Sequence, residues 1–106
     1  MDKVAILITT SNMDEAAMIG RNLVDEGLAA CANIVEGVRS IYKWKGVVCD
    51  DRECLMVVKT TAANFDAVER RVRELHSYEV PEVIALPILT GSRPYLDWVE
   101  ENSRIG

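Results

Sequence analysis

The chain has 106 residues and a net charge of −5 at pH 7, with 49% hydrophobic and 27% charged residues. This length predicts a single domain over residues 1–106, and this composition is typical of a folded globular protein rather than a disordered one. Because an acidic chain repels phosphate backbones, the charge argues against nucleic acid as a partner.

The first two predicted elements are a central strand and an amphipathic helix. Residues 4–9 are apolar on both faces, which is typical of a strand that is covered on both sides or lies in the middle of a sheet. Asn12 and Glu15 have the spacing of a helix capping box, and Gly27 stands where that helix would end in a left-handed residue. The apolar stripe of the helix is predicted to contain Ala16, Ile19, Leu23 and Val24.

A long hairpin is predicted next. Residues 28–44 favour extended structure and exceed the usual strand length of about 5–6 residues, with Gly37 allowing a bulge or bend. A tight turn is predicted at Lys45-Gly46 and a second break at residues 49–52. Residues 53–60 form a nearly continuous apolar run, which predicts a buried strand.

The second half of the chain predicts a helix, a strand and a short final helix. Thr60 or Thr61 is expected to cap the second helix, which ends near His76. Residues 81–88 predict a strand that either lies at a sheet edge or ends at Pro87, because proline removes a ladder donor. The apolar side of the final helix, which starts at residues 91–92, is predicted to contain Tyr95, Trp98 and Val99.

The element order is β-α-β-β-α-β plus a C-terminal helix. Two helices on one face of an antiparallel sheet make an α+β, ferredoxin-like sandwich. The overlong hairpin would leave unpaired edges and apolar side chains uncovered, and sheet edges of that kind are normally covered. We expect another copy of the chain to cover them.

The three cysteines predict a reduced, cytoplasmic protein, because their number is odd and no pair has C-x-x-C spacing. Cys31 could act as a soft metal ligand or reactive thiol, or as a small buried side chain between alanines. Cys49 and Cys54 flank the acidic stretch at residues 50–51 and could approach each other across a hairpin. The chain shows no signal peptide and no apolar run near 18 residues, so we expect no membrane partner.

The remaining polar candidates lie on two segments. His76 is the only histidine, and it is either a metal ligand or a cap at a helix C-terminus. Tyr78 and Glu82 belong to the string of residues 78–83, which offers either acid–base groups or solvated loop acids. Glu53 and Lys59 stand at opposite ends of one apolar strand and either line a pocket or form exposed strand ends.

Sequence motifs of common enzymes and binding modules are absent. The sequence contains no phosphate-binding G-x-x-x-x-G-K-[ST] loop, no G-x-G-x-x-G, no H-E-x-x-H and no G-x-S-x-G. A copper-chaperone version of this fold would carry C-x-x-C, and an RNA-recognition version would show aromatic strands on a basic sheet. The sequence therefore gives no positive sign of catalysis.

Five strings, in register over nearly the whole chain, resemble the CutA (divalent-cation tolerance) family. They are Leu28-Ala-Ala-Cys-Ala-Asn-Ile34, Ser40-Ile-Tyr-Lys-Trp-Lys-Gly46, Val58-Lys-Thr-Thr61, His76-Ser-Tyr-Glu-Val-Pro-Glu-Val83 and Tyr95-Leu-Asp-Trp98. The resemblance implies a ferredoxin-like subunit in a homotrimer similar to PII-type signalling proteins, with strands shared across subunits. It also implies a role in tolerance of divalent cations, chiefly copper.

The resemblance also suggests where a site would lie. It implies a pocket between subunits, lined by Cys31, Glu53, Lys59, His76, Tyr78 and Glu82, with Trp44 and Trp98 as walls. The copper-linked positions of bacterial members, a cysteine and a histidine pair, fall on Thr9, Leu75 and His76. Only His76 retains a ligand of that set, so it is the metal candidate.

The leading functional prediction is a homotrimeric divalent-cation tolerance protein that binds copper(II), another divalent cation or a small ligand between subunits. It predicts no catalysis and no obligatory cofactor. One alternative is an acid–base enzyme that uses Glu82, Tyr78 and His76 at an intersubunit site. Another is a structural scaffold or an anchoring partner for a second protein.

Overall fold

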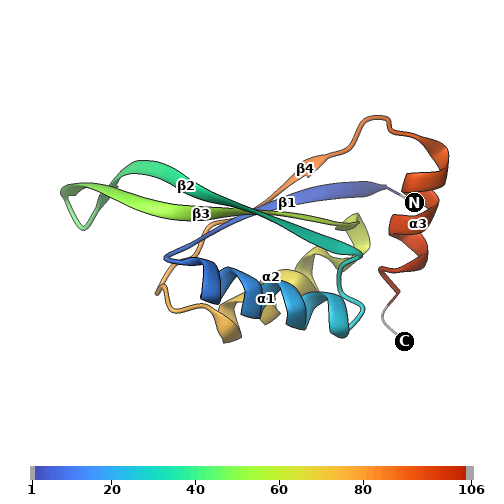
Figure 1. The fold of residues 1–106 in the computed structure, drawn as a ribbon, viewed down its shortest axis with the longest axis horizontal. Coiled ribbons are helices and arrows are strands. Elements are labelled where there is room, and N and C mark those ends of the chain that lie inside the picture. Colours follow the sequence, from blue (N-terminus) through green and yellow to red (C-terminus); the bar gives the residue numbers. More distant parts are fainter. Residues whose placement is uncertain (1, 105–106) are drawn as a thin grey trace.

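The computed structural model describes residues 2–104 and shows an antiparallel sheet with helices on one face (Figure 1). The elements are β1 (Lys3–Thr10), α1 (Met13–Asp25), β2 (Cys31–Trp44), β3 (Val47–Thr61), a 3₁₀ turn (Ala62–Asn64), α2 (Phe65–Leu75), β4 (Val83–Pro87) and α3 (Arg93–Glu101). The strand order is β2-β3-β1-β4. The predicted α+β architecture with a C-terminal helix is therefore confirmed.

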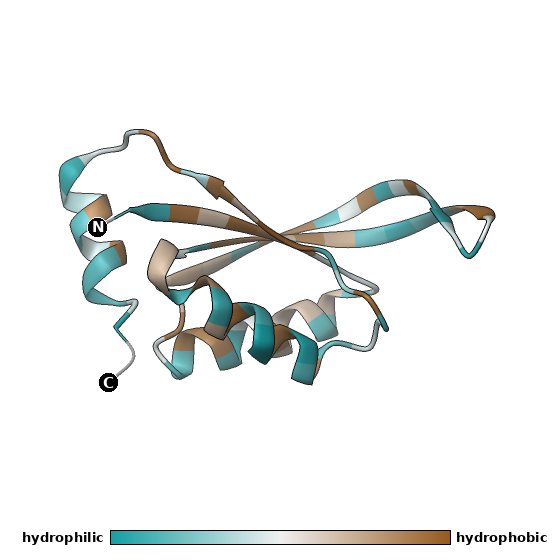
Figure 2. Ribbon diagram, turned by 180° about the vertical axis from the view of Figure 1, so that it is seen from behind, coloured by the Kyte–Doolittle hydropathy of each residue, from teal (hydrophilic) through white to brown (hydrophobic). Residues whose placement is uncertain are grey.

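Strand β1 lies in the middle of the sheet, as its apolar run predicts, and pairs with both β3 and β4. Its residues alternate strictly between buried and half-buried, so one face enters the core and the other faces away from the helices. In Figure 2, β1 and β4 are largely coloured as hydrophobic.

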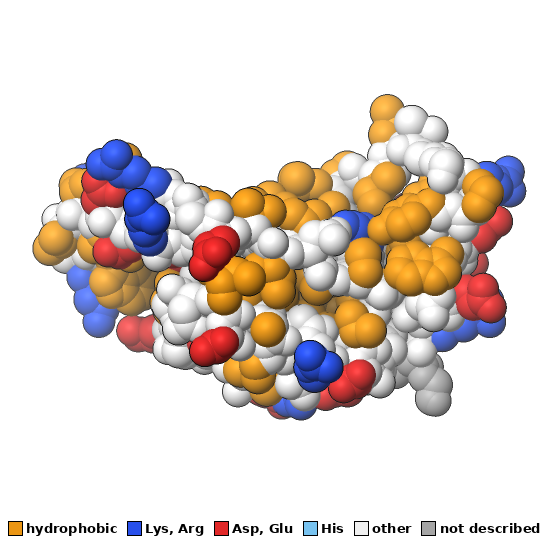
Figure 3. Space-filling view, in the orientation of Figure 1, with side chains coloured by type: hydrophobic (Ala, Val, Ile, Leu, Met, Phe, Trp, Pro, Cys, Tyr) orange, Lys and Arg blue, Asp and Glu red, His pale blue; other side chains and the backbone are white. Residues whose placement is uncertain are grey.

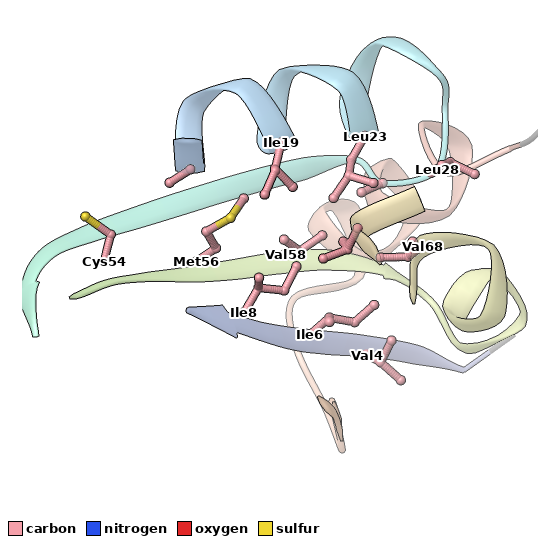
Figure 4. Packing of buried hydrophobic residues seen from close by; sticks show 13 residues of the cluster. Val4, Ile6, Ile8, Ile19, Leu23, Leu28, Cys54, Met56, Val58 and Val68 are labelled. Carbon is pink, nitrogen blue, oxygen red and sulfur yellow. The ribbon is translucent and has the colours of Figure 1, made fainter. Parts of the chain in front are cut away.

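The core lies between the sheet and the two helices α1 and α2. Ile19 and Leu23 of α1 point towards Met56 and Val58 of β3, and all four side chains are fully buried (Figure 4). Val24, which we expected in the same stripe, is 41% exposed. It follows Leu23 by one position, about 100° further round the helix, which turns it out of the core.

The first helix starts and ends as predicted. The Asn12 side chain accepts a hydrogen bond from the Glu15 amide at 2.8 Å, and the Glu15 carboxylate reaches back to the Ser11 amide at 3.3 Å. Gly27 follows the helix with φ +73°. A Cβ at this position would lie 2.7 Å from the carbonyl oxygen of Arg104, so the close approach requires glycine.

The β2–β3 hairpin projects from the body, and the molecule measures 44 × 26 × 21 Å (Figure 1). The predicted turn is present, with positive φ at Lys45 and Gly46, and the predicted bulge lies between Val35 and Val38. The break expected at residues 49–52 is wrong, because β3 is continuous through them. Their acidic side chains have cross-strand partners: Arg39 binds Asp50 through two hydrogen bonds, and Tyr42 donates to Asp51.

The second helix begins differently from the prediction. Thr60 and Thr61 provide no cap to α2, since the Thr60 hydroxyl donates to the Leu28 carbonyl at 2.7 Å and the 3₁₀ turn intervenes. The end of α2 next to His76 is confirmed. Strand β4 lies at the sheet edge as expected, and starts at Val83.

Helix α3 lies at the end of the sheet opposite the hairpin (Figure 1). Only Val99 of its predicted apolar side is buried, whereas Tyr95 and Trp98 remain about two-fifths exposed. Within residues 2–104, no helix combines the length and the apolar character that crossing a membrane requires.

The sheet face turned away from α1 and α2 is apolar. Directly paired residues share a face, and the pairing groups these side chains together: Ala5, Leu7, Val35, Leu55, Val57, Ile84 and Leu86. We call this set the outer face. Figure 3 shows hydrophobic side chains over the middle of the molecule and beside α3. Within residues 2–104, neither α1 nor α2 covers this apolar surface, and α3 lies only at one end of the sheet.

Candidate functional site

Three of the predicted site residues, Glu53, Tyr78 and Glu82, line one cleft of about 410 Å³ at the base of the hairpin. Its full lining is Thr9, Tyr42, Trp44, Glu53, Tyr78, Glu79, Val80 and Glu82, and we call it the Glu53 cleft. Glu53 is two residues from Leu55 on β3, so both side chains lie on the same face of the sheet. Thr9 pairs directly with Leu55 and shares that face, so the cleft lies on the side of the outer face.

Glu53 is a buried carboxylate at this cleft. Its side of β3 faces away from α1 and α2, yet the residue is only 8% exposed. The Tyr78 hydroxyl donates a hydrogen bond to Glu53 Oε2 at 2.6 Å, which is the short distance expected for a charge-assisted bond. Burial and this bond to Glu53 raise the pKa of Tyr78, so the phenol stays protonated at neutral pH.

His76 fixes the backbone that carries Tyr78. Its Nε2 lies 2.7 Å from the Thr9 carbonyl oxygen, and its Nδ1 lies 3.0 Å from the Tyr78 amide nitrogen. A carbonyl only accepts and an amide N–H only donates, so the ring is the neutral tautomer with the proton on Nε2. The two rings also pack with centroids 4.6 Å apart. A metal ion at either ring nitrogen would displace one of these hydrogen bonds.

Glu15 supports the same segment from the start of α1. Its Oε2 accepts from the Ser77 amide at 2.9 Å and lies 4.0 Å from His76 Nδ1. Burial raises the pKa of Glu15, but hydrogen bonds from Ser77 and Ser11 outweigh that effect and leave the pKa below its usual 4.5. The turn after α2 is therefore attached to the core by Glu15 and His76 together.

Cys31 and Lys59 lie elsewhere. They pair directly across β2 and β3, at the end of the sheet away from the hairpin tip. The Lys59 ammonium donates to the Asn33 side-chain oxygen, and Cys31 Sγ lies 3.5 Å from the Tyr95 hydroxyl. The contact with Cys31 raises the pKa of Tyr95 to about 12.

The six residues of the predicted pocket therefore form two groups within one chain. Trp44 lines the Glu53 cleft, whereas Trp98 packs against Tyr95, with ring centroids 5.6 Å apart, beside the second group. A single pocket that contains both groups would need residues from two subunits. The predicted pocket between subunits therefore stays a prediction.

The sequence reasoning missed Tyr42 as part of the site. Tyr42 and Trp44 alternate along β2, so their side chains lie on one face of the hairpin, as the period of two already indicates. Tyr42 donates to Asp51 at 2.5 Å, and this bond raises the pKa of Tyr42 to about 12. The aromatic side of the cleft could have been found from this spacing.

The acidic side chains of one chain do not converge on a metal site. Across the described residues 2–104, no three His, Cys, Asp or Glu side chains lie close enough together to hold an ion. The carboxylates of Glu53, Glu79 and Glu82 share the cleft without forming such a group. The donor set of a single chain therefore does not fit a resident copper ion, which prefers converging nitrogen and sulfur ligands.

The chain is similar to known proteins over almost its full length. The family model described as CutA1 divalent ion tolerance protein matches residues 4–102. A divalent-cation tolerance protein CutA from Thermus thermophilus is 51% identical over 98 residues, which cover 92% of this chain and 95% of the relative. A chloroplastic CutA from Arabidopsis thaliana is 40% identical over 101 residues, and the match covers 95% of this chain but only 56% of that longer protein.

Solved structures agree with this result. The Thermus thermophilus divalent cation tolerance protein superposes with a TM-score of 0.93 at 49% identity, covering 96% of this chain and 99% of the other. CutA1 from Oryza sativa superposes with a TM-score of 0.95 at 38% identity, covering 100% and 97%. The fold, the sequence match and its extent lead to one conclusion: the chain belongs to the CutA1 divalent ion tolerance family.

Proposed function

We propose that the protein serves divalent-cation tolerance as a homotrimer that binds a divalent cation or a small ligand at the Glu53 cleft, without catalysis. The observation that supports this most strongly is the buried Glu53 carboxylate, which lines a cleft on the sheet side facing away from α1 and α2. A concave site with a few placed polar groups is typical of small-ligand sites.

The exposed apolar surface supports association of the chain with itself. At the hairpin tip Ile41, Val47 and Val48 are each more than 60% exposed, and the outer face adds Ile84 and Leu86 at nearly half. Large exposed apolar areas on a folded chain mark interaction surfaces. Strands β2 and β4 also leave two sheet edges open in the single chain, and edges are normally covered.

Cation binding in this proposal depends on the partner subunits. Residues 2–104 of one chain supply carboxylates at the cleft but no converging set of three, so donors from a second chain would complete the coordination. Oxygen ligands of this kind suit hard divalent ions better than copper. Copper binding through His76 would require the ring to release Thr9 or Tyr78.

The acid–base alternative has less support. Tyr78 keeps its proton because its pKa is raised, and His76 gives both ring nitrogens to the backbone. A general acid or base needs a pKa near the working pH and a free path to the substrate. Of the three proposed catalytic groups, only Glu82 is exposed to solvent.

The cytoplasm is the proposed compartment, because the three cysteines Cys31, Cys49 and Cys54 are all free thiols. Relatives are named for other places, among them the chloroplastic protein of Arabidopsis thaliana and a periplasmic protein of Archaeoglobus fulgidus. Fractionation of cells that express the native gene would decide this point.

The binding proposal is tested by calorimetric titration of the reduced protein with Zn(II) and with Cu(II). Wild type is compared with Glu53→Gln, with His76→Ala and with Glu101→Gln, a control that removes one exposed carboxylate from α3. The proposal expects saturable heat that Glu53→Gln loses and Glu101→Gln keeps. Binding lost only in His76→Ala would assign the ion to the imidazole, and no saturable binding would remove the cation role.

A further inference from the structure

Within residues 2–104, the Glu53 cleft is lined mainly by acidic and aromatic side chains and by no basic ones. Among the described residues that line it, three are carboxylates, three are aromatic, and none is lysine or arginine. Its volume of about 410 Å³ falls within the range of roughly 300–1,000 Å³ that small-molecule sites occupy. A site with this lining repels anions and offers both negative charge and π faces to a cation.

The tyrosine hydroxyls are already committed. Tyr42 donates to Asp51 at 2.5 Å and Tyr78 donates to Glu53 at 2.6 Å. Neither hydroxyl is therefore free to donate to an anionic ligand. What the two tyrosines offer to a ligand is the face of the ring, and Trp44, which is about two-fifths exposed, adds a third aromatic ring.

An ammonium group from the protein itself already lies beside these groups. The Lys45 Nζ atom is 5.6 Å from the centroid of the Trp44 ring, within the range of a cation–π contact. It is also 3.8 Å from Glu79 Oε2. Both side chains of that ion pair are 71% exposed, so the pair is weak and Lys45 can leave without a large cost.

We propose that the Glu53 cleft binds an organic ammonium ion, with the charge over the Trp44 ring and beside the Glu79 carboxylate, where the Lys45 ammonium now lies. The inference rests on the proposed function in one respect, that this cleft is the ligand site. It specifies the ligand class: a primary or quaternary amine, for which π faces and spaced carboxylates suffice. A bare metal ion needs converging donors, which the described part of one chain does not supply.

Two consequences separate this proposal from simple apolar binding. A neutral molecule of the same shape loses the cation–π and carboxylate attractions and should bind about tenfold more weakly. Lys45 competes for the same π face, so Lys45→Met should tighten binding of an added ammonium ion several-fold. Improved binding cannot result from a misfolded variant.

The experiment is calorimetric titration with choline chloride and, separately, with its neutral isostere 3,3-dimethylbutan-1-ol. Zinc chloride and sodium phosphate are the other two ligands. The variants are Trp44→Leu, which removes the π face, and Lys45→Met. Lys43→Met is the matched control, because it makes the same charge change on an exposed residue one position from Trp44, on the other face of β2. Circular dichroism confirms that each variant is folded.

The proposal expects saturable choline binding that exceeds isostere binding by about tenfold, is lost in Trp44→Leu, and is tighter in Lys45→Met but not in Lys43→Met. Equal binding of choline and its isostere would overturn it, as would phosphate binding at the cleft. Zinc binding that needs Glu53, together with no choline binding, would overturn this inference and leave the proposed function standing. No saturable binding of any of the four ligands would overturn both.

Discussion

Replacing Tyr78 by phenylalanine tests most sharply whether the Tyr78–Glu53 hydrogen bond stabilises the fold. The change removes one oxygen atom and leaves the Glu53 carboxylate, 8% exposed, without its 2.6 Å hydrogen bond. Hydrogen bonds to charged groups contribute about 1.5–3 kcal/mol, so we expect Tyr78→Phe to lower the free energy of unfolding by about 2 kcal/mol. For a chain of this size that corresponds to a fall in Tm of about 8 °C.

The structure also offers a matched control. Tyr42 donates a hydrogen bond to Asp51 in the same way, but both residues are exposed at the hairpin, so water replaces the lost partner. We expect Tyr42→Phe to cost about 0.5 kcal/mol. Thermal unfolding at one fixed protein concentration measures both. Equal losses in the two variants would refute the claim that burial of Glu53 makes its bond important.

A double-mutant cycle isolates the pair itself. If the cost of Tyr78→Phe comes from an unpaired buried charge, the same change should cost about 1–2 kcal/mol less when Glu53 is already glutamine. Additive losses from the two single changes would show that Tyr78 stabilises the fold by other contacts.

Three further predictions concern the frame around the site. Gly27→Ala should lower the free energy of unfolding by more than about 2 kcal/mol, because the φ of Gly27 is +73° and a Cβ there would lie 2.7 Å from a backbone oxygen. Gly46 also has a positive φ but has open space around it, so Gly46→Ala should lower the free energy of unfolding by about 1 kcal/mol. Chemical denaturation that ranks the two variants in the opposite order would contradict the steric argument. Asn64→Ala should cost about 2–3 kcal/mol, since its buried amide donates to two carbonyls and a hydroxyl; a loss below about 0.5 kcal/mol would be inconsistent with those bonds. Glu15 has a lowered folded pKa, so its stabilising effect is full above its unfolded value near 4.5 and is lost as pH falls through the folded pKa. As the pH is lowered from 7, the free energy of unfolding should therefore fall less steeply in Glu15→Gln than in wild type. The same pH dependence in both proteins would argue against the bond from Ser77 to Glu15.

Local patterns predicted the fold well because the signals for its elements are local. The apolar run at residues 4–9, the Asn12 cap and the Lys45-Gly46 turn each depend on a few neighbouring residues. The break expected at residues 49–52 was wrong because acidic residues there gain partners from the opposite strand. Strand pairing decides such cases, and it is not visible in the local sequence.

The site was harder to predict because its members meet only in three dimensions. Glu53 and Tyr78 are 25 residues apart, and the local sequence around neither residue predicts their contact. Lys59 lies six residues after Glu53 on one strand, so their backbones are about 20 Å apart, and the cleft runs from Glu53 towards the hairpin tip rather than towards Lys59. The sequence marked His76 as unusual because it is the only histidine, but its two bonds to the backbone became visible only in the fold.

The central claim is that a trimer covers the apolar outer face and completes the Glu53 cleft. Light scattering coupled to gel filtration, at micromolar concentration and again after tenfold dilution, tests it most directly. The account predicts a particle of three times the chain mass of 11.8 kDa, unchanged by dilution. A particle with the mass of one chain at micromolar concentration would contradict it, because the outer face and the hairpin tip would then remain exposed to water.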